Sequence, residues 1–218
     1  MESSRSSESV EEVCGGILGE LGSATLGELM EGKRVFPETT GERGKLKRVA
    51  AALKSEWPGE GNPEKGRMRN VCTFNGPVEE KYLHVTAKLN YGWSVPPEKT
   101  ERKHFYYTAG SALVEDNYVD YSPPTNLYYT CVSPDGKSGV VNSSINAKWV
   151  TERDKQTEDA MIVKVLLIAA QKMRAELGCV NELDLSPDAE VEVVVDTPGG
   201  MKAGLPLPRV PESGPVQR

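Results

Sequence analysis

The sequence predicts an α+β protein in which a mostly antiparallel sheet packs against a long C-terminal helix, with a basic N-terminal helix and flexible polar arms. Two observations predict this class. Segments of strand period follow one another between about residues 70 and 150, and a segment of helical period follows them at 155–177. Strands in succession followed by a helix are typical of α+β folds rather than of alternating βαβ units.

Period-two alternation of apolar and polar residues predicts the strands. From Lys81 to Trp93 the apolar positions include Leu89, Tyr91 and Trp93, which indicates a half-buried strand. Turn formers from Ser133 to Ser138 predict an antiparallel hairpin between the strands on either side of them. The remaining strands are expected at Asn70–Phe74, His104–Val114, Leu127–Val132, Val140–Val150 and Val191–Val195.

Helical spacing of apolar residues predicts three helices. One has a stripe from Leu46 to Trp57 and ends at Pro58-Gly59, and its other face is basic. The segment 155–177 is apolar nearly all round, so we expect it to be buried against the sheet, with Gly178 ending it. A third stripe, from Val10 to Leu21, is interrupted or followed by Gly15, Gly16, Gly19 and Gly22 and is expected to be helical only when docked.

Composition predicts one core domain with polar ends. The chain has 218 residues, of which 38% are hydrophobic and 27% charged. We expect an acidic, partly helical N-terminal arm at 1–42, a single core at 43–196 and a disordered Pro/Gly-rich tail at 197–218. No apolar run is long enough to cross a bilayer and the N-terminus is polar, so we expect neither a transmembrane segment nor secretion.

The four cysteines form no metal-binding pattern. Cys14, Cys72, Cys131 and Cys179 contain no CxxC pair, and the chain has only two histidines. We therefore expect reduced thiols that fill the core, and no metal or cofactor.

Charge is distributed unevenly along the chain. Residues 1–42 hold nine acidic and three basic residues, and residues 178–218 hold seven and three, so acidic arms flank a basic middle. The face of the helix near Leu46 is either an ordinary solvated face or a binding surface for nucleic acid phosphates or anionic lipid. That surface would be formed by Lys45, Lys47, Arg48, Lys54, Arg67 and Arg69.

Catalytic motifs are incomplete. Gly136-Lys137-Ser138 and the run from Asp196 to Gly199 imitate fragments of a GTPase, but Cys131 stands where the phosphate loop needs glycine. The segment after Ser138 alternates as a strand, and no NKxD motif follows Gly199. The aspartic-protease turn is also incomplete, because Pro198 replaces its glycine. We therefore predict a protein without catalytic residues.

Two groups of residues are candidates for protein contacts. Tyr118 and Tyr121 lie in a loop, where a rigid ring with a polar tip makes a good contact, whereas the four strand tyrosines are expected to fill a sheet face. The apolar stripe of the N-terminal arm has no obvious place in a core that begins near Leu46. We expect it to dock on a neighbouring subunit, through Val10, Val13, Ile17 and Leu21.

A compact α+β core with polar arms, one basic helix and no catalytic constellation resembles, in its organisation, the matrix proteins of negative-strand RNA viruses. The resemblance implies a non-enzymatic viral structural protein that self-associates and contacts the nucleocapsid, through viral nucleoprotein or RNA, and the inner face of an anionic membrane as a peripheral protein. Its expected location is the virion and the host cytoplasm, with the nucleus left open. The alternative is a nucleic-acid-binding viral accessory protein, such as a movement protein or a suppressor of host RNA defence. A third class is an enzyme whose site is assembled from distant residues.

Overall fold

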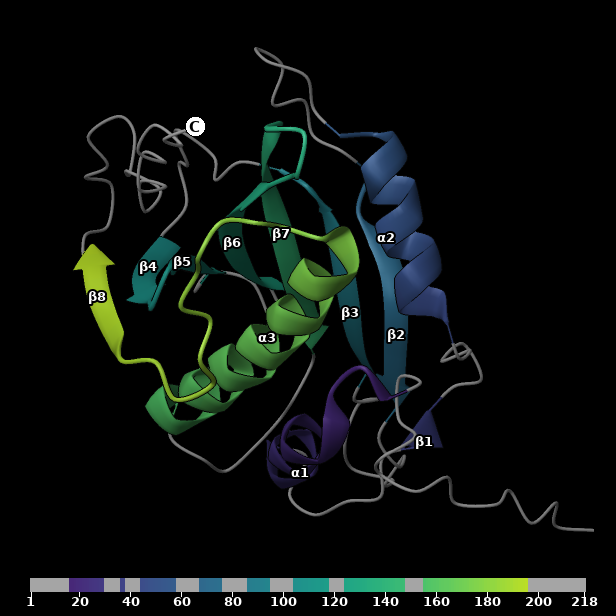
Figure 1. Ribbon diagram of the computed structural model, residues 1–218. Coiled ribbons are helices and arrows are strands. Elements are labelled where there is room, and N and C mark those ends of the chain that lie inside the picture. The colour runs from purple at the N-terminus through teal and green to yellow at the C-terminus, as the bar shows by residue number, and fades with distance from the viewer. Residues whose placement is uncertain are drawn as a thin grey trace, which may run out of the picture.

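The computed structural model of the chain describes residues 16–29, 36–37, 44–57, 67–75, 86–94, 104–117, 124–147 and 155–195. Within them, eight strands form one sheet and three helices accompany it (Figure 1). The helices are α1 (Gly19–Leu29), α2 (Lys45–Ser55) and α3 (Lys155–Leu177). The strands are β1 (Phe36–Pro37), β2 (Arg69–Asn75), β3 (Thr86–Trp93), β4 (His104–Ala109), β5 (Ala112–Asn117), β6 (Pro124–Val132), β7 (Ser138–Ala147) and β8 (Val191–Val195).

The sheet is antiparallel at every pairing, in the order β1-β2-β3-β7-β6-β5-β4-β8. This confirms the predicted α+β class with an antiparallel sheet. The predicted hairpin is β6–β7, which pairs Val132 with Ser138 around Gly136, whose positive φ of 83° suits glycine. The fragment that imitates a phosphate loop is therefore a turn between two strands.

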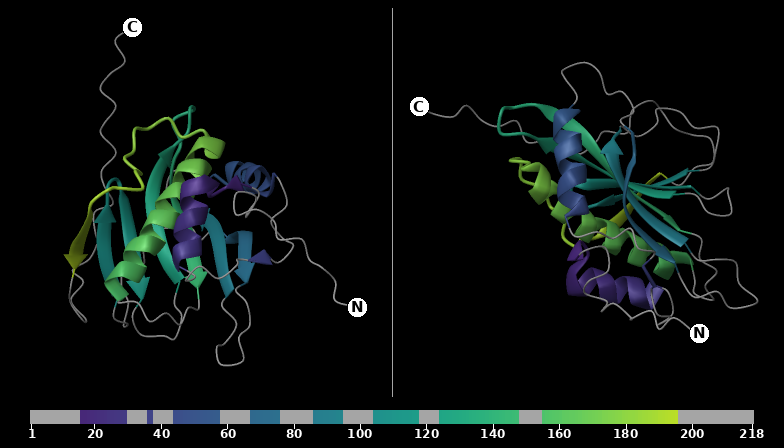
Figure 2. Two further views of the ribbon diagram at one scale, coloured as in Figure 1. Left: turned by 90° about the horizontal axis from the view of Figure 1, so that it is seen from below. Right: turned by 90° about the vertical axis from the view of Figure 1, so that its right-hand side faces the viewer.

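The helices lie on one face of the sheet (Figure 2). Tyr91 and Trp93 are two residues apart in β3 and so share a face. The hydroxyl of Tyr91 donates to the carbonyl of Ala169 in α3 at 3.0 Å, and the indole of Trp93 donates to the carbonyl of Leu53 in α2 at 2.8 Å. Helix α1 packs on α3, with the result that α3 is enclosed between the sheet and a second helix.

One hydrophobic cluster joins the three helices to this face of the sheet. The sheet supplies buried residues from three neighbouring strands, β3, β7 and β6: Leu89, Tyr91, Trp93, Val141, Ile145, Leu127, Tyr129 and Cys131. Helix α3 supplies a run that is buried on every side, residues 165–170. Complete burial explains why the apolar residues of this helix are not confined to one stripe.

The core begins earlier in the chain than predicted. Ile17 is only 5% exposed and belongs to the same cluster as the sheet residues, as do Leu18, Leu26 and Leu29. Helix α1 reaches α3 closely because Gly22 has no side chain: a Cβ there would lie 3.3 Å from a methyl carbon of Ile168. Part of the segment expected to be a free arm is therefore a layer of the protein's own core.

The predicted strand His104–Val114 is in fact two strands. β4 ends at Ala109 and β5 begins at Ala112, and Gly110 turns the chain with φ 56°. The segment before β8 holds this turn, because the amide of Ser111 donates to the carbonyl of Asp184 at 2.7 Å. A Cβ on Gly110 would lie 2.4 Å from that carbonyl oxygen, so the close approach requires glycine.

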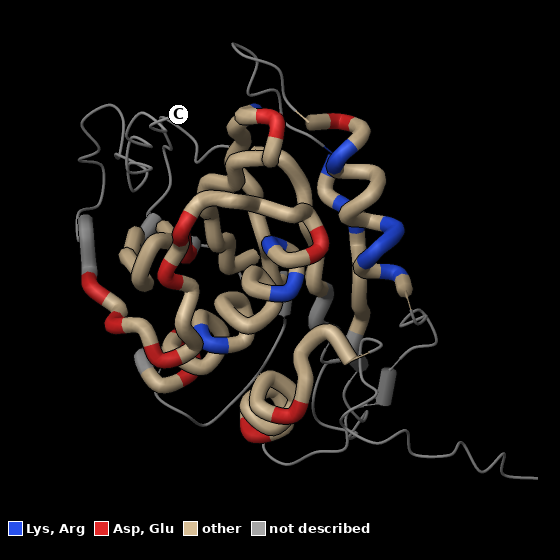
Figure 3. The backbone as a smooth tube through the Cα atoms, viewed as in Figure 1, with Lys and Arg blue, Asp and Glu red and all other residues tan. Residues whose placement is uncertain are grey.

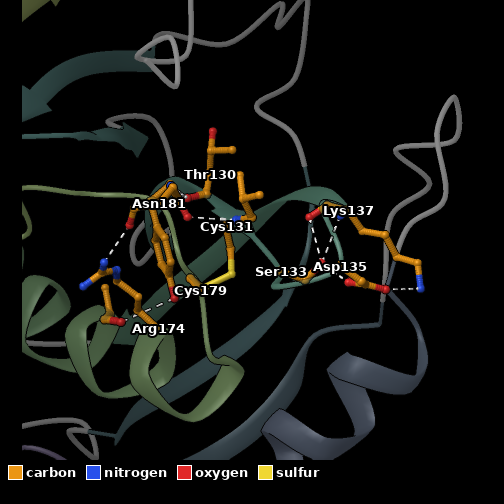
Figure 4. Close-up of a disulfide and its surroundings, with 11 residues drawn as sticks. Thr130, Cys131, Ser133, Asp135, Lys137, Arg174, Cys179 and Asn181 are labelled. Atoms are coloured by element: carbon orange, nitrogen blue, oxygen red, sulfur yellow. Dashed lines mark hydrogen bonds and ion pairs between the residues drawn. A yellow bond between two sulfur atoms is a disulfide. The ribbon is translucent and has the colours of Figure 1, made fainter. Parts of the chain in front are cut away.

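The cysteines are paired, which corrects the expectation of reduced thiols. Cys131 in β6 forms a disulfide with Cys179, just after α3 (Figure 4). Cys72 is also disulfide-bonded. The link is supported by Asn181, whose side chain accepts from the amide of Val132 and donates to the carbonyl of Thr130, both at 2.9 Å. The wide spacing of the cysteines hid this pairing, because residues 48 apart in sequence meet only once α3 has packed on the sheet.

Candidate functional surfaces

Helix α2 separates an apolar face from a basic one. Leu46, Val49, Ala50 and Leu53 are buried, whereas Lys47 and Lys54 are exposed along the flank of the helix next to this stripe. Lys47 and Lys54 are seven residues apart, so they lie about 10 Å apart along the same side of the helix. Figure 3 shows this row of basic residues along α2, at one edge of the molecule.

The other predicted basic residues extend the same surface. The ammonium of Lys45 lies 3.4 Å from the Asn70 side-chain oxygen in β2, and Arg69 pairs with Glu56 at the end of α2. Arg48 and Arg67 are exposed. The structure therefore brings the six predicted residues onto α2 and the adjoining start of β2, and among them Lys47, Lys54 and Arg67 form no ion pair within the described chain. We call this surface the basic pole.

An acidic surface lies at the other edge of the sheet. Residues 175–195 contain six acidic residues and no basic ones. Of these, Glu182, Asp184, Asp188, Glu190 and Glu192 are exposed along the segment that leads into β8. Asp188 pairs with Lys164 of α3 at 3.1 Å, whereas Glu182, Glu190 and Glu192 have no ion pair among the described residues. We call this surface the acidic pole.

The acidic excess near the C-terminus is visible in the sequence, where it was expected to belong to an arm. Its signal was the long interval without a basic residue, which continues into the strand Val191–Val195. The position of that strand at the edge of the sheet could not be seen, because it depends on pairing with β4 more than 80 residues earlier in the chain.

The two poles are far enough apart to act independently. Six strand spacings separate β2 from β8 in the sheet, which corresponds to about 29 Å. The Debye length at physiological ionic strength is about 8 Å, so dissolved ions screen the attraction between the two poles of one molecule and neither pole neutralises the other. Each pole therefore presents its own charge to a partner.

The predicted protein-contact residues have mixed outcomes. Ile17 is buried in the core and cannot contact a neighbour, whereas Leu21 is 49% exposed on α1. Val10, Val13, Tyr118 and Tyr121 lie outside the described residues.

A row of polar residues crosses the sheet on the face away from the helices. Directly paired positions on six strands are Asn70, Asn90, Ser144, Asn126, Glu115 and Tyr106. Glu115 is 3% exposed and accepts hydrogen bonds from three other described residues: from the Tyr128 hydroxyl at 2.6 Å, from the Tyr106 hydroxyl at 3.2 Å and from the Asn126 amide at 3.3 Å. The row was not predicted, because the strand expected from the sequence ended at Val114, one residue before Glu115.

The two tyrosines that donate to Glu115 are held neutral. Burial, with the adjacent Glu115 carboxylate as a smaller cause, raises the pKa of both Tyr106 and Tyr128 well above the usual tyrosine value. Both therefore remain hydrogen-bond donors to Glu115 throughout the physiological pH range. The predicted filling of one sheet face by strand tyrosines is only partly right, since Tyr129 is buried on the helix-covered face instead.

Among the described residues, no group of His, Cys, Asp and Glu side chains is arranged to hold a metal ion. No helix in the described part of the chain is long and apolar enough to cross a membrane. No protein-family model, curated protein or solved structure matches this chain.

Proposed function

We propose that the protein is a non-enzymatic structural protein of the matrix type that self-associates through the basic pole. The observation that carries the proposal is the outward face of α2, where Lys47 and Lys54 are exposed and not neutralised by an ion pair in the described chain. An uncompensated basic row on a helix whose other face is fixed in the core is suited to a rigid contact with an acidic partner.

The disulfides support a place in the virion. Disulfides persist in oxidising environments and on virion surfaces but are rare in the cytosol. Cys131, Cys179 and Cys72 are all disulfide-bonded, which does not fit the reducing host cytoplasm that the resemblance implied as one location. We place the assembled form in the virion.

A nucleic-acid-binding accessory protein is the second candidate, because the exposed lysines of α2 could also contact phosphates. Peripheral binding to anionic lipid would use the same residues. Nucleic acid, anionic lipid and a second copy of the chain are distinguished by measuring RNA binding, vesicle binding and self-association for the same variant.

The test uses a double variant that carries both Lys47→Gln and Lys54→Gln. Its control is Lys172→Glu, a substitution at an exposed position of α3 that changes the net charge by the same amount. Sedimentation is measured for the protein alone, with single-stranded RNA and with vesicles containing phosphatidylserine. We expect the double variant to lose most self-association and the Lys172 variant to keep it. Loss of RNA or vesicle binding with unchanged self-association would favour those partners and contradict the proposal.

A further inference from the structure

We infer that the partner of the basic pole is the acidic pole of a second copy of this chain, so that subunits join head to tail. This inference rests on the self-association proposed above and names the second surface. Lys47 and Lys54, which have no ion pair in the described chain, are equal in number and opposite in charge to Glu190 and Glu192 beside β8.

The two rows have similar dimensions. Glu190 and Glu192 are two residues apart at the start of an extended strand, which places them about 7 Å apart. Lys47 and Lys54 lie about 10 Å apart on their helix. Long lysine and glutamate side chains can span this difference, so both ion pairs can form in one contact.

The position of β8 makes this pole available. β8 pairs with β4 on one side, and none of the other described strands pairs with it. Val191, between the two glutamates, is 41% exposed. Val191 points to the opposite face from the glutamates, so a partner bound to the charges would cover the sheet edge rather than this side chain.

The same charges argue against a symmetric contact. Two copies joined edge to edge through β8 would bring Glu190 and Glu192 against their own equivalents, and like charges placed opposite each other destabilise strand pairing. A basic surface removes this repulsion. A contact between two β8 edges is therefore disfavoured relative to a contact between β8 of one copy and α2 of another.

Head-to-tail contact has a structural consequence. A contact between two different surfaces is heterologous, and repetition of it gives a closed ring or an open filament. Because the poles lie at opposite edges of the sheet, binding at one leaves the other available for the next subunit. Assembly is then not limited to a dimer.

The experiment uses two full-length variants that each lose one pole. The basic-pole variant is Lys47→Gln with Lys54→Gln, and the acidic-pole variant is Glu190→Gln with Glu192→Gln. The charge-matched controls are Lys172→Glu for the first and Glu20→Lys, at an exposed position of α1, for the second. Masses are measured by sedimentation velocity for each variant alone and for an equimolar mixture.

We expect each pole variant alone to be monomeric, both controls to assemble like the wild type, and the mixture to form dimers and nothing larger. Each mixed pair has one intact acidic pole and one intact basic pole, so a single contact forms and assembly stops. An acidic-pole variant that assembles normally, or a mixture that stays monomeric, would overturn this inference while leaving the basic pole as a contact surface. A basic-pole variant that assembles normally would overturn the proposed function as well.

Discussion

Glu115 is the residue whose environment differs most from what its type suggests. Acidic residues are rarely buried unless their oxygens are satisfied, and here both oxygens accept hydrogen bonds from neighbouring strands. The donors come from β4 and β6, on either side of β5. The carboxylate therefore fixes three strands in one register, because a slip of one residue would turn the donors to the other face.

Removing the shortest of these bonds should be costly. Tyr128→Phe deletes the donor at 2.6 Å to a buried carboxylate oxygen, which among the described residues also accepts from the amide of Asn126. We expect a loss of about 2 kcal/mol in the free energy of unfolding, measured by chemical denaturation. Tyr106→Phe, whose bond is longer at 3.2 Å, should lose less. Equal stability of Tyr128→Phe and the wild type would show that the row does not stabilise the fold.

Local sequence pattern identified most buried residues of the strands but not this carboxylate. Leu89, Tyr91 and Trp93 are buried as alternation predicted. Glu115 follows the same alternation after Leu113, yet its charge and the polar residues after it indicated a loop. Its burial depends on donors brought by two other strands, which no local pattern contains.

At the scale of elements, the connection after α3 joins the helix layer to the sheet. The Cys131–Cys179 disulfide and the Asn181 hydrogen bonds attach it to β6 (Figure 4). The side chain of Gln171 also donates to the carbonyl of Leu185 at 2.9 Å. The same connection then holds the β4–β5 turn and delivers β8 to the edge. The acidic pole is thus positioned by contacts with both layers.

Removal of this disulfide should destabilise the fold without abolishing it. The bond closes a loop of 48 residues, for which chain entropy predicts a contribution of about 4 kcal/mol. We expect Cys131→Ala with Cys179→Ala to unfold at lower denaturant concentration by about this amount. Circular dichroism in the absence of denaturant should be unchanged, because the Asn181 hydrogen bonds remain. A variant as stable as the wild type would mean that the bond adds nothing to the junction.

The elements themselves were more predictable than their contacts. Periodicity located the basic helix and the β6–β7 hairpin, because both depend on residues near each other in sequence. The apolar pattern continues through Gly110, so periodicity wrongly predicted one strand where the structure has β4 and β5. The turn there is held by Asp184, which is 74 residues away from Gly110 and so has no local signature.

At the scale of the whole molecule, the fold converts a charge pattern in sequence into a charge pattern in space. The basic middle and the acidic C-terminal region were visible in the sequence. The antiparallel sheet places the basic residues beside β2 and the acidic residues beside β8, at the far end of the sheet from β2 (Figure 3). Their separation was not predictable, because the strand order is set by pairings between residues distant in the chain.

The central claim is self-association through charged surfaces, and sedimentation velocity of the wild-type, full-length protein tests it most directly. The mass is measured over a range of concentrations, first at low salt and then at about 0.5 M salt, where the Debye length falls to roughly 4 Å. At low salt the mean mass should rise continuously with concentration through a series of sizes, and at high salt it should fall toward that of the monomer. A clean monomer at every concentration in low salt would contradict the account.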